Sequence, residues 1–214
     1  MNSVILRALR TPAVAALAII TSLVGLPAEA DAQRVGGTGY GASVRTTLTS
    51  TQSPVAALPA GGGYVVGEAA SFGVPSTLDA RWLTAVTTGS VSDASEPASA
   101  QTVSEVESVN VLNGLVRADN VTAIASSYAA NGTAGSDADG SGFVNLVVNG
   151  TAITTDVAPN TRIDIPLVGY VVLNEQIRGG DGATSSSLTV NMIHVRLLDG
   201  ADIVVGSASS SASR

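Results

Sequence analysis

The segment VNVLNGLVRAD, residues 109–119, decides the fold of this chain. Two apolar runs flank its central dipeptide, Asn113-Gly114. Asn and Gly both tolerate a positive φ, so this dipeptide permits the tight type I′ turn that joins two antiparallel strands. Asn149-Gly150 and Asp199-Gly200 also lie between apolar segments. The three dipeptides predict β-hairpins and antiparallel pairing of neighbouring strands.

Further strands are predicted on both sides of this hairpin. Beyond residue 35 the chain is rich in Ala, Val, Thr, Ser and Gly, and Gly or Pro interrupts it about every ten residues, a composition typical of short strands joined by turns. We expect about ten strands, a number close to that of common two-sheet folds. They lie near residues 40–48, 64–72, 83–91, 102–112, 115–128, 143–148, 161–165, 168–175, 187–198 and 203–206.

These strands predict an all-β fold, a single-domain antiparallel β-sandwich over residues 33–206. A β-solenoid is the alternative, because small residues and Gly recur often, although no fixed repeat period is present. Residues 93–101 are expected to form a surface loop, and residues 207–214 a disordered Ser-rich tail. The apolar parity switches between Met192 and Ile193, which indicates a bulge there or burial on both faces.

Residues 1–32 have the organisation of a bacterial signal peptide. Arg7 and Arg10 close a short positive stretch, and residues 12–26 form an almost uninterrupted apolar run. That run is shorter than the about 20 apolar residues of a membrane-spanning helix. Small residues follow at 28–30 and 30–32, and either triplet is a candidate cleavage site. We therefore expect export and a secreted or cell-surface location.

Composition excludes several classes of function. The net charge of -7 combines 10 Arg, no Lys and 17 acidic residues, whereas nucleic acid and anionic membranes both demand a basic patch. The chain has no Cys, so disulfides, thiol nucleophiles and zinc sites of Cys and His are excluded. About 180 residues remain after cleavage, which is enough for one domain with a sizeable core.

Several motifs, in order along the chain, resemble those of the choice-of-anchor P family. They are LPAGGG (58–63), VNVLNGLVRAD (109–119), VVNGT (147–151), APNT (158–161), GYVVLNEQ (169–176) and LTVNMIHV (188–195). The resemblance implies a bacterial surface or secreted protein and supplies no mechanism and no site residues. Residues after Val205 are rich in Ser and Ala, with no membrane-spanning run, so we expect no transmembrane anchor in the mature chain.

One segment resembles the first half of a calcium-binding loop. Asp137, Asp139 and Ser141 place oxygen side chains at alternate positions around Gly140. The twelfth position from Asp137 is Val148, where an EF-hand needs a bidentate Glu. The three residues stay candidates for a Ca²⁺ site of another geometry, while a plain acidic turn is favoured. We expect no cofactor.

Catalytic motifs are missing from the sequence. His194 is the only histidine, and no Gly-x-Ser-x-Gly nucleophile elbow accompanies it. Glu105 and Glu107 project from one strand face, yet a glycosidase also needs a sugar cleft, so a solvated face is the favoured interpretation. We therefore expect no catalytic residue and no enzyme activity.

Four polar residues lie in or beside apolar strands. They are Asn174, Glu175, Asn191 and His194. An unpartnered polar side chain in such a setting would cost about 1 to 3 kcal/mol. We expect these residues to form a structural polar cluster on adjacent or facing strands, with Arg178 or Arg196 as possible ionic partners of Glu175.

Two hypotheses about function follow. The favoured one is a structural or interaction protein of the envelope, whose partner the sequence does not identify. The alternative is a carbohydrate-binding module or glycan-active hydrolase. Trp82 and a Tyr on one exposed concave face would favour glycan binding, and a buried Trp82 would disfavour it.

The secreted protein is expected to begin at Asp31 or Gln33, because signal peptidase cleaves after small residues. Amino-terminal sequencing of the protein from culture supernatant measures this directly. An intact Met1 on the extracellular protein would contradict the signal-peptide hypothesis.

Overall fold

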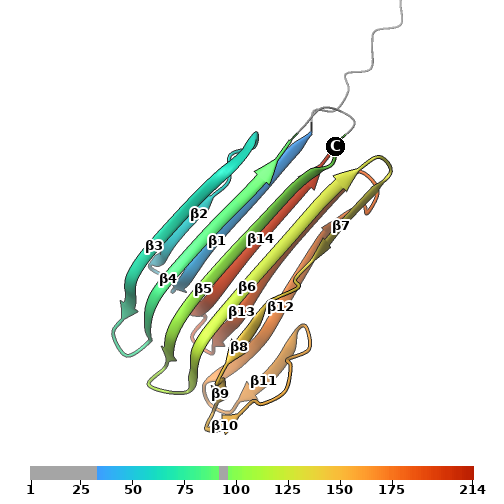
Figure 1. Ribbon diagram of the computed structural model, residues 1–214. Coiled ribbons are helices and arrows are strands. Elements are labelled where there is room, and N and C mark those ends of the chain that lie inside the picture. The colour runs from blue at the N-terminus through green and yellow to red at the C-terminus, as the bar shows by residue number, and fades with distance from the viewer. Residues whose placement is uncertain (1–32, 92–95) are drawn as a thin grey trace, which may run out of the picture. The chain divides into compact units, whose positions relative to one another are not determined.

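The computed structural model describes residues 33–91 and 96–214, and the predicted signal peptide and its cleavage sites lie outside them. The described chain consists of strands and connecting turns, in two antiparallel sheets that pack face to face (Figure 1). Along this part of the chain no helix could cross a membrane. The predicted all-β sandwich is confirmed. The solenoid alternative is wrong, because β1 and β14, from opposite ends of the chain, pair within one sheet.

Sheet A has six strands in the order β11-β12-β13-β14-β1-β2. Their bounds are β1 Arg34–Arg45, β2 Ser50–Ala57, β11 Thr161–Ile165, β12 Gly169–Gly180, β13 Ser185–Leu197 and β14 Asp202–Ser213.

Sheet B has eight strands, with β10-β9-β6-β5-β4-β3 in order and β7 and β8 also paired to β6. Their bounds are β3 Gly62–Val74, β4 Leu78–Ser90, β5 Ala98–Val111, β6 Val116–Ala130, β7 Thr133–Asp137, β8 Gly142–Val144, β9 Val147–Val148 and β10 Thr151–Ala152. In Figure 1 the long strands of sheet B lie in front of sheet A.

The Asn-Gly turns form as predicted. Asn149 and Gly150 have φ of 48° and 79° and join β9 to β10 as a two-residue loop, as a type I′ turn requires. Asn113 and Gly114, with φ of 54° and 96°, lie in the turn between β5 and β6. Asp199-Gly200 also lies between β13 and β14, but only Gly200, with φ 85°, is left-handed, so this hairpin forms without the predicted type I′ turn. Local turn chemistry therefore fixes the two Asn-Gly hairpins.

Two predictions about local structure are wrong, and some strands were missed. The expected tail is a strand, since Ser207–Ser213 pairs with β13 on one side and β1 on the other. Residues 98–101 of the expected loop belong to β5, and its residues 93–95 lie outside the described chain. Strands β2, β7 and β10 were not predicted at all. These segments are rich in Ser, Ala and Thr, which are typical of loops unless a facing sheet buries them.

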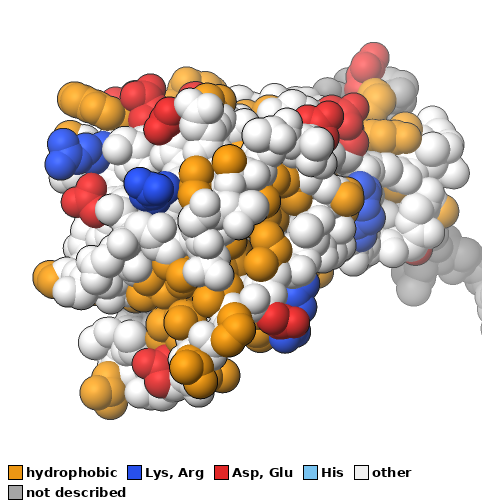
Figure 2. All heavy atoms as spheres, turned by 90° about the horizontal axis from the view of Figure 1, so that it is seen from below, with side chains coloured by type: hydrophobic (Ala, Val, Ile, Leu, Met, Phe, Trp, Pro, Cys, Tyr) orange, Lys and Arg blue, Asp and Glu red, His pale blue; other side chains and the backbone are white. Residues whose placement is uncertain are grey.

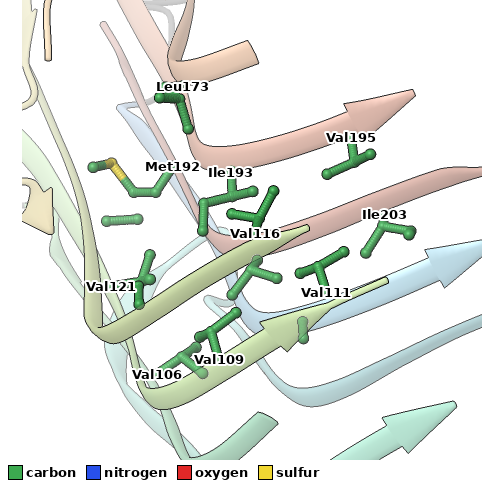
Figure 3. Close-up of a cluster of buried hydrophobic side chains, with 14 of the residues drawn as sticks. Val106, Val109, Val111, Val116, Val121, Leu173, Met192, Ile193, Val195 and Ile203 are labelled. Atoms are coloured by element: carbon green, nitrogen blue, oxygen red, sulfur yellow. The ribbon is translucent and has the colours of Figure 1, made fainter. Parts of the chain in front are cut away.

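Large apolar side chains fill one half of the space between the sheets (Figure 3). They come from β5 and β6 in sheet B and from β12, β13 and β14 in sheet A, and they point toward one another. The labelled ones are Val106, Val109, Val111, Val116, Val121, Leu173, Met192, Ile193, Val195 and Ile203, all fully buried or nearly so. Burial of each such side chain contributes about 1.5 to 3 kcal/mol.

Small side chains fill the other half, where the sheets come closer together. A Cβ added at Gly37 would lie 2.6 Å from Thr102 Oγ1, and one at Gly39 would lie 2.8 Å from Thr102 Cγ2. Ser127 and Ser210 hydrogen-bond across the two sheets at 2.7 Å in a buried setting. This half therefore needs Gly, Ala, Ser and Thr.

The two halves meet along a line at which the strands change which alternate side chains point inward, here named the crease. In β13 the core side chains are Leu188, Val190 and Met192 and then Ile193 and Val195, so the inward parity switches where the sequence predicted it. The partners on β12 and β14 keep their register across this point, so it is not a β-bulge in sheet A.

Residues with left-handed backbones lie on the crease in β12, β14, β4 and β5, whereas β13 changes parity without one. In sheet A, Asn174 has φ 50° and Gly206 has φ 66°. In sheet B, Trp82 has φ 49° beside a register shift between β4 and β5, and Ser108 has φ 53°. Each such residue turns the next side chain to the opposite face, so both sheets change parity together.

Gly41, which faces Leu83 where β1 meets the crease, provides a test of this packing. Gly41→Ala is expected to lower the free energy of unfolding by about 1 to 3 kcal/mol, because the new Cβ overpacks the core. That Cβ would lie 2.8 Å from Leu83 Cβ, an atom that no rotamer change can move. Urea unfolding measures the change. Gly61→Ala, with nothing within 4 Å of the added Cβ, is the matched control. Equal stability of the two variants would contradict the close packing.

Candidate functional site

Three of the four predicted polar residues meet on the outer face of sheet A. Asn191 Nδ2 donates to Glu175 Oε2 at 2.7 Å, and His194 Nδ1 lies 2.8 Å from the same oxygen. Ser207 Oγ donates to Asn191 Oδ1 at 2.7 Å. Asn191, His194 and Ser207 are buried although they face away from the core. The cluster thus bridges β12, β13 and β14.

Asn174 lies outside this cluster. Its Nδ2 donates to the carbonyl oxygen of Val157 at 2.9 Å, and its Oδ1 accepts from Gln176. The left-handed backbone of Asn174 in the crease aims its side chain away from Glu175. Arg178 is not an ionic partner of Glu175 either, because it donates to the carbonyl oxygen of Ser136 at 2.6 Å. The predicted four-residue cluster is therefore wrong for Asn174.

His194 is placed between two carboxylates. Its Nε2 lies 3.5 Å from Asp202 Oδ1, opposite the nitrogen that meets Glu175. Asp202 also forms an ion pair with Arg45 of β1, and Arg196 Nε lies 3.7 Å from Asp202 Oδ1. Both ring nitrogens thus face acids, so the imidazole is not positioned to activate a hydroxyl nucleophile.

The two carboxylates are held in their charged form. Burial raises the pKa of Glu175, but hydrogen bonds from Asn191 and His194 outweigh it, and the net pKa is lowered. Burial also raises the pKa of Asp202, and the hydrogen bond and charge of Arg45 outweigh that effect. The charged carboxylates therefore link four strands of sheet A through ion pairs and hydrogen bonds. Both are engaged in these contacts and are not placed for proton transfer to a substrate.

The calcium candidates form a turn after β7. Asp137 Oδ1 accepts from the backbone N–H of Asp139 at 3.2 Å, and the Ser141 hydroxyl is engaged with the backbone of Ile124. In the part of the chain that the structure covers, no group of three or more His, Asp or Glu could hold a metal ion. The local hydrogen bonds agree with the favoured acidic turn.

Three exposed aromatic residues lie on the outer face of sheet B, with Tyr64 and Tyr128 toward the opposite end of the sheet from Trp82. Trp82 is 65% exposed, Tyr64 69% and Tyr128 42%. On β4, Leu83 and Thr87 point into the core, so their neighbours Trp82 and Thr88 point to the outer side. Tyr64 pairs with Thr88 and therefore lies on the same outer side. Trp82 and two tyrosines thus share one exposed face, which is part of what the sequence hypothesis required for glycan binding, but neither tyrosine lines the hollow beside Trp82.

Trp82 borders a shallow trough of about 340 Å³, here named the Trp82 trough. Its other walls include Glu68 on β3 and Glu105 and Glu107 on β5. Both β5 carboxylates are exposed, as expected of a solvated strand face, and Asn120 Nδ2 donates to Glu105 at 2.8 Å. A left-handed backbone at a bulky Trp costs about 1 to 3 kcal/mol and is commonest at functional sites.

A larger pocket of about 570 Å³ opens between the two sheets. Phe143, Ile153, Val157 and Met192 supply apolar walls, and Asn174 stands at the polar side. Sequence reasoning missed this pocket, because its walls come from four separate segments without a shared motif. Figure 2 shows hydrophobic side chains gathered over the lower end of the sandwich, with acidic and basic side chains around them.

Comparison with known proteins gives one family. Residues 28–175 match the family described as Domain of unknown function (DUF8256). The match includes every residue of the Trp82 trough and Glu175, but not Asn191 or His194. The comparisons with curated proteins and with solved structures return no match.

The polar cluster makes stability depend on acid pH. Glu175 and Asp202 have lowered pKa values in the folded state, against about 4.3 and 3.9 in an unfolded chain. Their stabilisation is therefore complete above these values and is lost as the pH falls through the folded pKa values. Glu175→Gln is expected to flatten the dependence of unfolding free energy on pH between about pH 5 and pH 2.

Urea unfolding of wild type and variant across that range measures the two slopes. Glu107→Gln, which removes a carboxylate from the exposed face of β5, controls for net charge. Coincident slopes for wild type and Glu175→Gln would show that the cluster does not stabilise the fold.

Proposed function

We propose that this chain, which belongs to the family described as Domain of unknown function (DUF8256), is an exported bacterial protein that acts by binding, not by catalysis. Its place is the cell surface or the extracellular space. The positive, apolar and small-residue segments of residues 1–32 support export. The resemblance to choice-of-anchor P proteins supports a surface role.

The exposed Trp82 is the observation that carries the proposal of binding. A large aromatic side chain that is 65% exposed leaves apolar surface in water, which a partner would cover. Its strained backbone holds the ring on the outer face of sheet B. His194, the only histidine of the sequence, is engaged by carboxylates instead of lying in a cleft.

The chemistry of the Trp82 trough favours glycans as the ligand class. The apolar face of a pyranose ring stacks on an indole, and its hydroxyl groups donate hydrogen bonds to carboxylates such as Glu68 and Glu107. Three acidic side chains disfavour uronic acids and sulfated sugars through like-charge repulsion. Neutral or amino sugars therefore fit best. Small hydroxyl and amide side chains, Thr88, Gln101 and Ser126 among them, continue the face beyond the trough.

The single tryptophan makes the test direct. Trp82 is the only Trp, so its intrinsic fluorescence reports any ligand that stacks on it. Titration with neutral β-glucan and chitin oligosaccharides is expected to shift the emission for at least one class. Trp82→Ala is expected to weaken that binding by about tenfold or more in calorimetry, equivalent to about 1.4 kcal/mol.

Leu48→Ala is the matched control, because Leu48 is 92% exposed in the turn between β1 and β2, away from the trough. It is expected to bind as wild type does. Equal affinity of Trp82→Ala and wild type, in a folded variant, would contradict glycan binding at the trough and leave a protein partner as the ligand of this face.

A further inference from the structure

The four margins of the two sheets differ in how they are protected. An unpaired strand at a sheet margin exposes backbone N–H and C=O groups that can pair with another chain, and native proteins usually block such margins. Sheet A ends in β2 on one side and β11 on the other. Sheet B ends in β3 on one side and in the short strands β7 to β10 on the other.

Three of these margins carry features that hinder strand pairing with another chain. Pro54 lies within β2 and removes a backbone donor. β11 is only five residues long, and Arg162 and Asp164 form an ion pair on it at 2.7 Å. The far side of β6 is covered by pieces of two to five residues.

β3 lacks these blocks. It is 13 residues long, contains no Pro, Lys or Arg, and has Glu68 as its only charged residue. Among the described strands, β4 alone pairs with it, so its other edge is open. In Figure 1 β3 runs along the margin of the front sheet. A long open edge of this kind is expected to have a partner strand.

We infer that the partner is a second copy of this chain, whose β3 pairs antiparallel with the first about a two-fold axis at Gly67. A two-fold axis perpendicular to the sheet keeps the outer faces of both copies on the same side, so sheet B continues from one copy into the next. An axis at Glu68 would set the two Glu68 carboxylates directly opposite each other, which is unfavourable.

The Gly67 register keeps the two Glu68 carboxylates apart and brings aromatic side chains of the outer face near each other. It places Val66 opposite Glu68 of the second copy, and Tyr64 opposite Ala70 of the second copy. Ala70 lies beside Trp82, since the pairs Ala69 to Leu83 and Ser71 to Arg81 flank it. Tyr64 and Trp82 are the two most exposed aromatic residues, and this register brings them together across the interface.

This inference rests on the proposed glycan binding for its functional consequence. Within one chain Tyr64 pairs with Thr88, six residues along β4 from Trp82, so the two rings lie about 20 Å apart at 3.3 Å per residue. Across the pair of copies they lie two strands apart, about 10 Å. The second copy therefore supplies Tyr64 to the Trp82 trough of the first and lengthens the platform.

Charge substitutions at Val66 test the pairing and its register. Val66→Glu puts like charges opposite each other twice per dimer and is expected to raise the dimer dissociation constant about fivefold or more. Val66→Lys removes the same apolar side chain but faces Glu68 with an opposite charge, so dimerisation is retained or strengthened. Val144→Glu, at an exposed valine of β8 on the far side of sheet B, is the control.

Analytical ultracentrifugation of the mature chain over a concentration series measures these constants. A wild-type chain that stays monomeric up to the millimolar range would overturn the inference and leave the β3 edge to an extended segment of another protein. Equal weakening by Val66→Glu and Val66→Lys would overturn the Gly67 register. If the wild type dimerises and Trp82→Ala binds glycan as the wild type does, the proposed function fails and this inference stands. If the wild type stays monomeric and Trp82→Ala loses glycan binding, this inference fails and the proposed function stands.

Discussion

Close contact between the two sheets around Thr102 is the constraint on which the rest of the structure depends. Gly37 and Gly39 face Thr102 without room for a side chain, and the Ser127 and Ser210 hydroxyls bond directly across the gap. Only small residues fit there, which accounts for the Ser- and Ala-rich sequence of β14 and of the start of β5. Segments with loop-like composition are thus buried strands, and the carboxyl-terminal strand is held between β1 and β13.

The other half of the sandwich is filled by Val, Leu, Ile and Met, so the two sheets must change their packing along their length. The crease makes this change. Left-handed backbones at Asn174, Gly206, Trp82 and Ser108 reverse the inward parity of β12, β14, β4 and β5 at one level. The strain of each non-glycine residue is offset by core packing on both sides of the crease.

The crease also decides which side chains reach the outer face of each sheet. On sheet A it leaves Asn191 and His194 on the outer side, where Glu175 and Asp202 engage them and tie neighbouring strands together. On sheet B it holds Trp82 in solvent beside exposed carboxylates. One face therefore has its polar groups satisfied within the fold, and the other leaves aromatic surface and an open strand edge free for partners.

The sequence by itself determined the fold class, the Asn-Gly hairpins, the parity switch at Met192 and Ile193 and the proximity of Glu175 to His194. These follow from neighbouring residues, through turn chemistry, side-chain alternation and the need of buried polar groups for partners. Only the tertiary structure decided that the Ser-rich tail is a strand, that Asn174 turns away from the polar cluster and that Trp82 is exposed. Each of these depends on segments far apart in the chain, since burial and backbone handedness are set by the facing sheet and not by the residue's own neighbours.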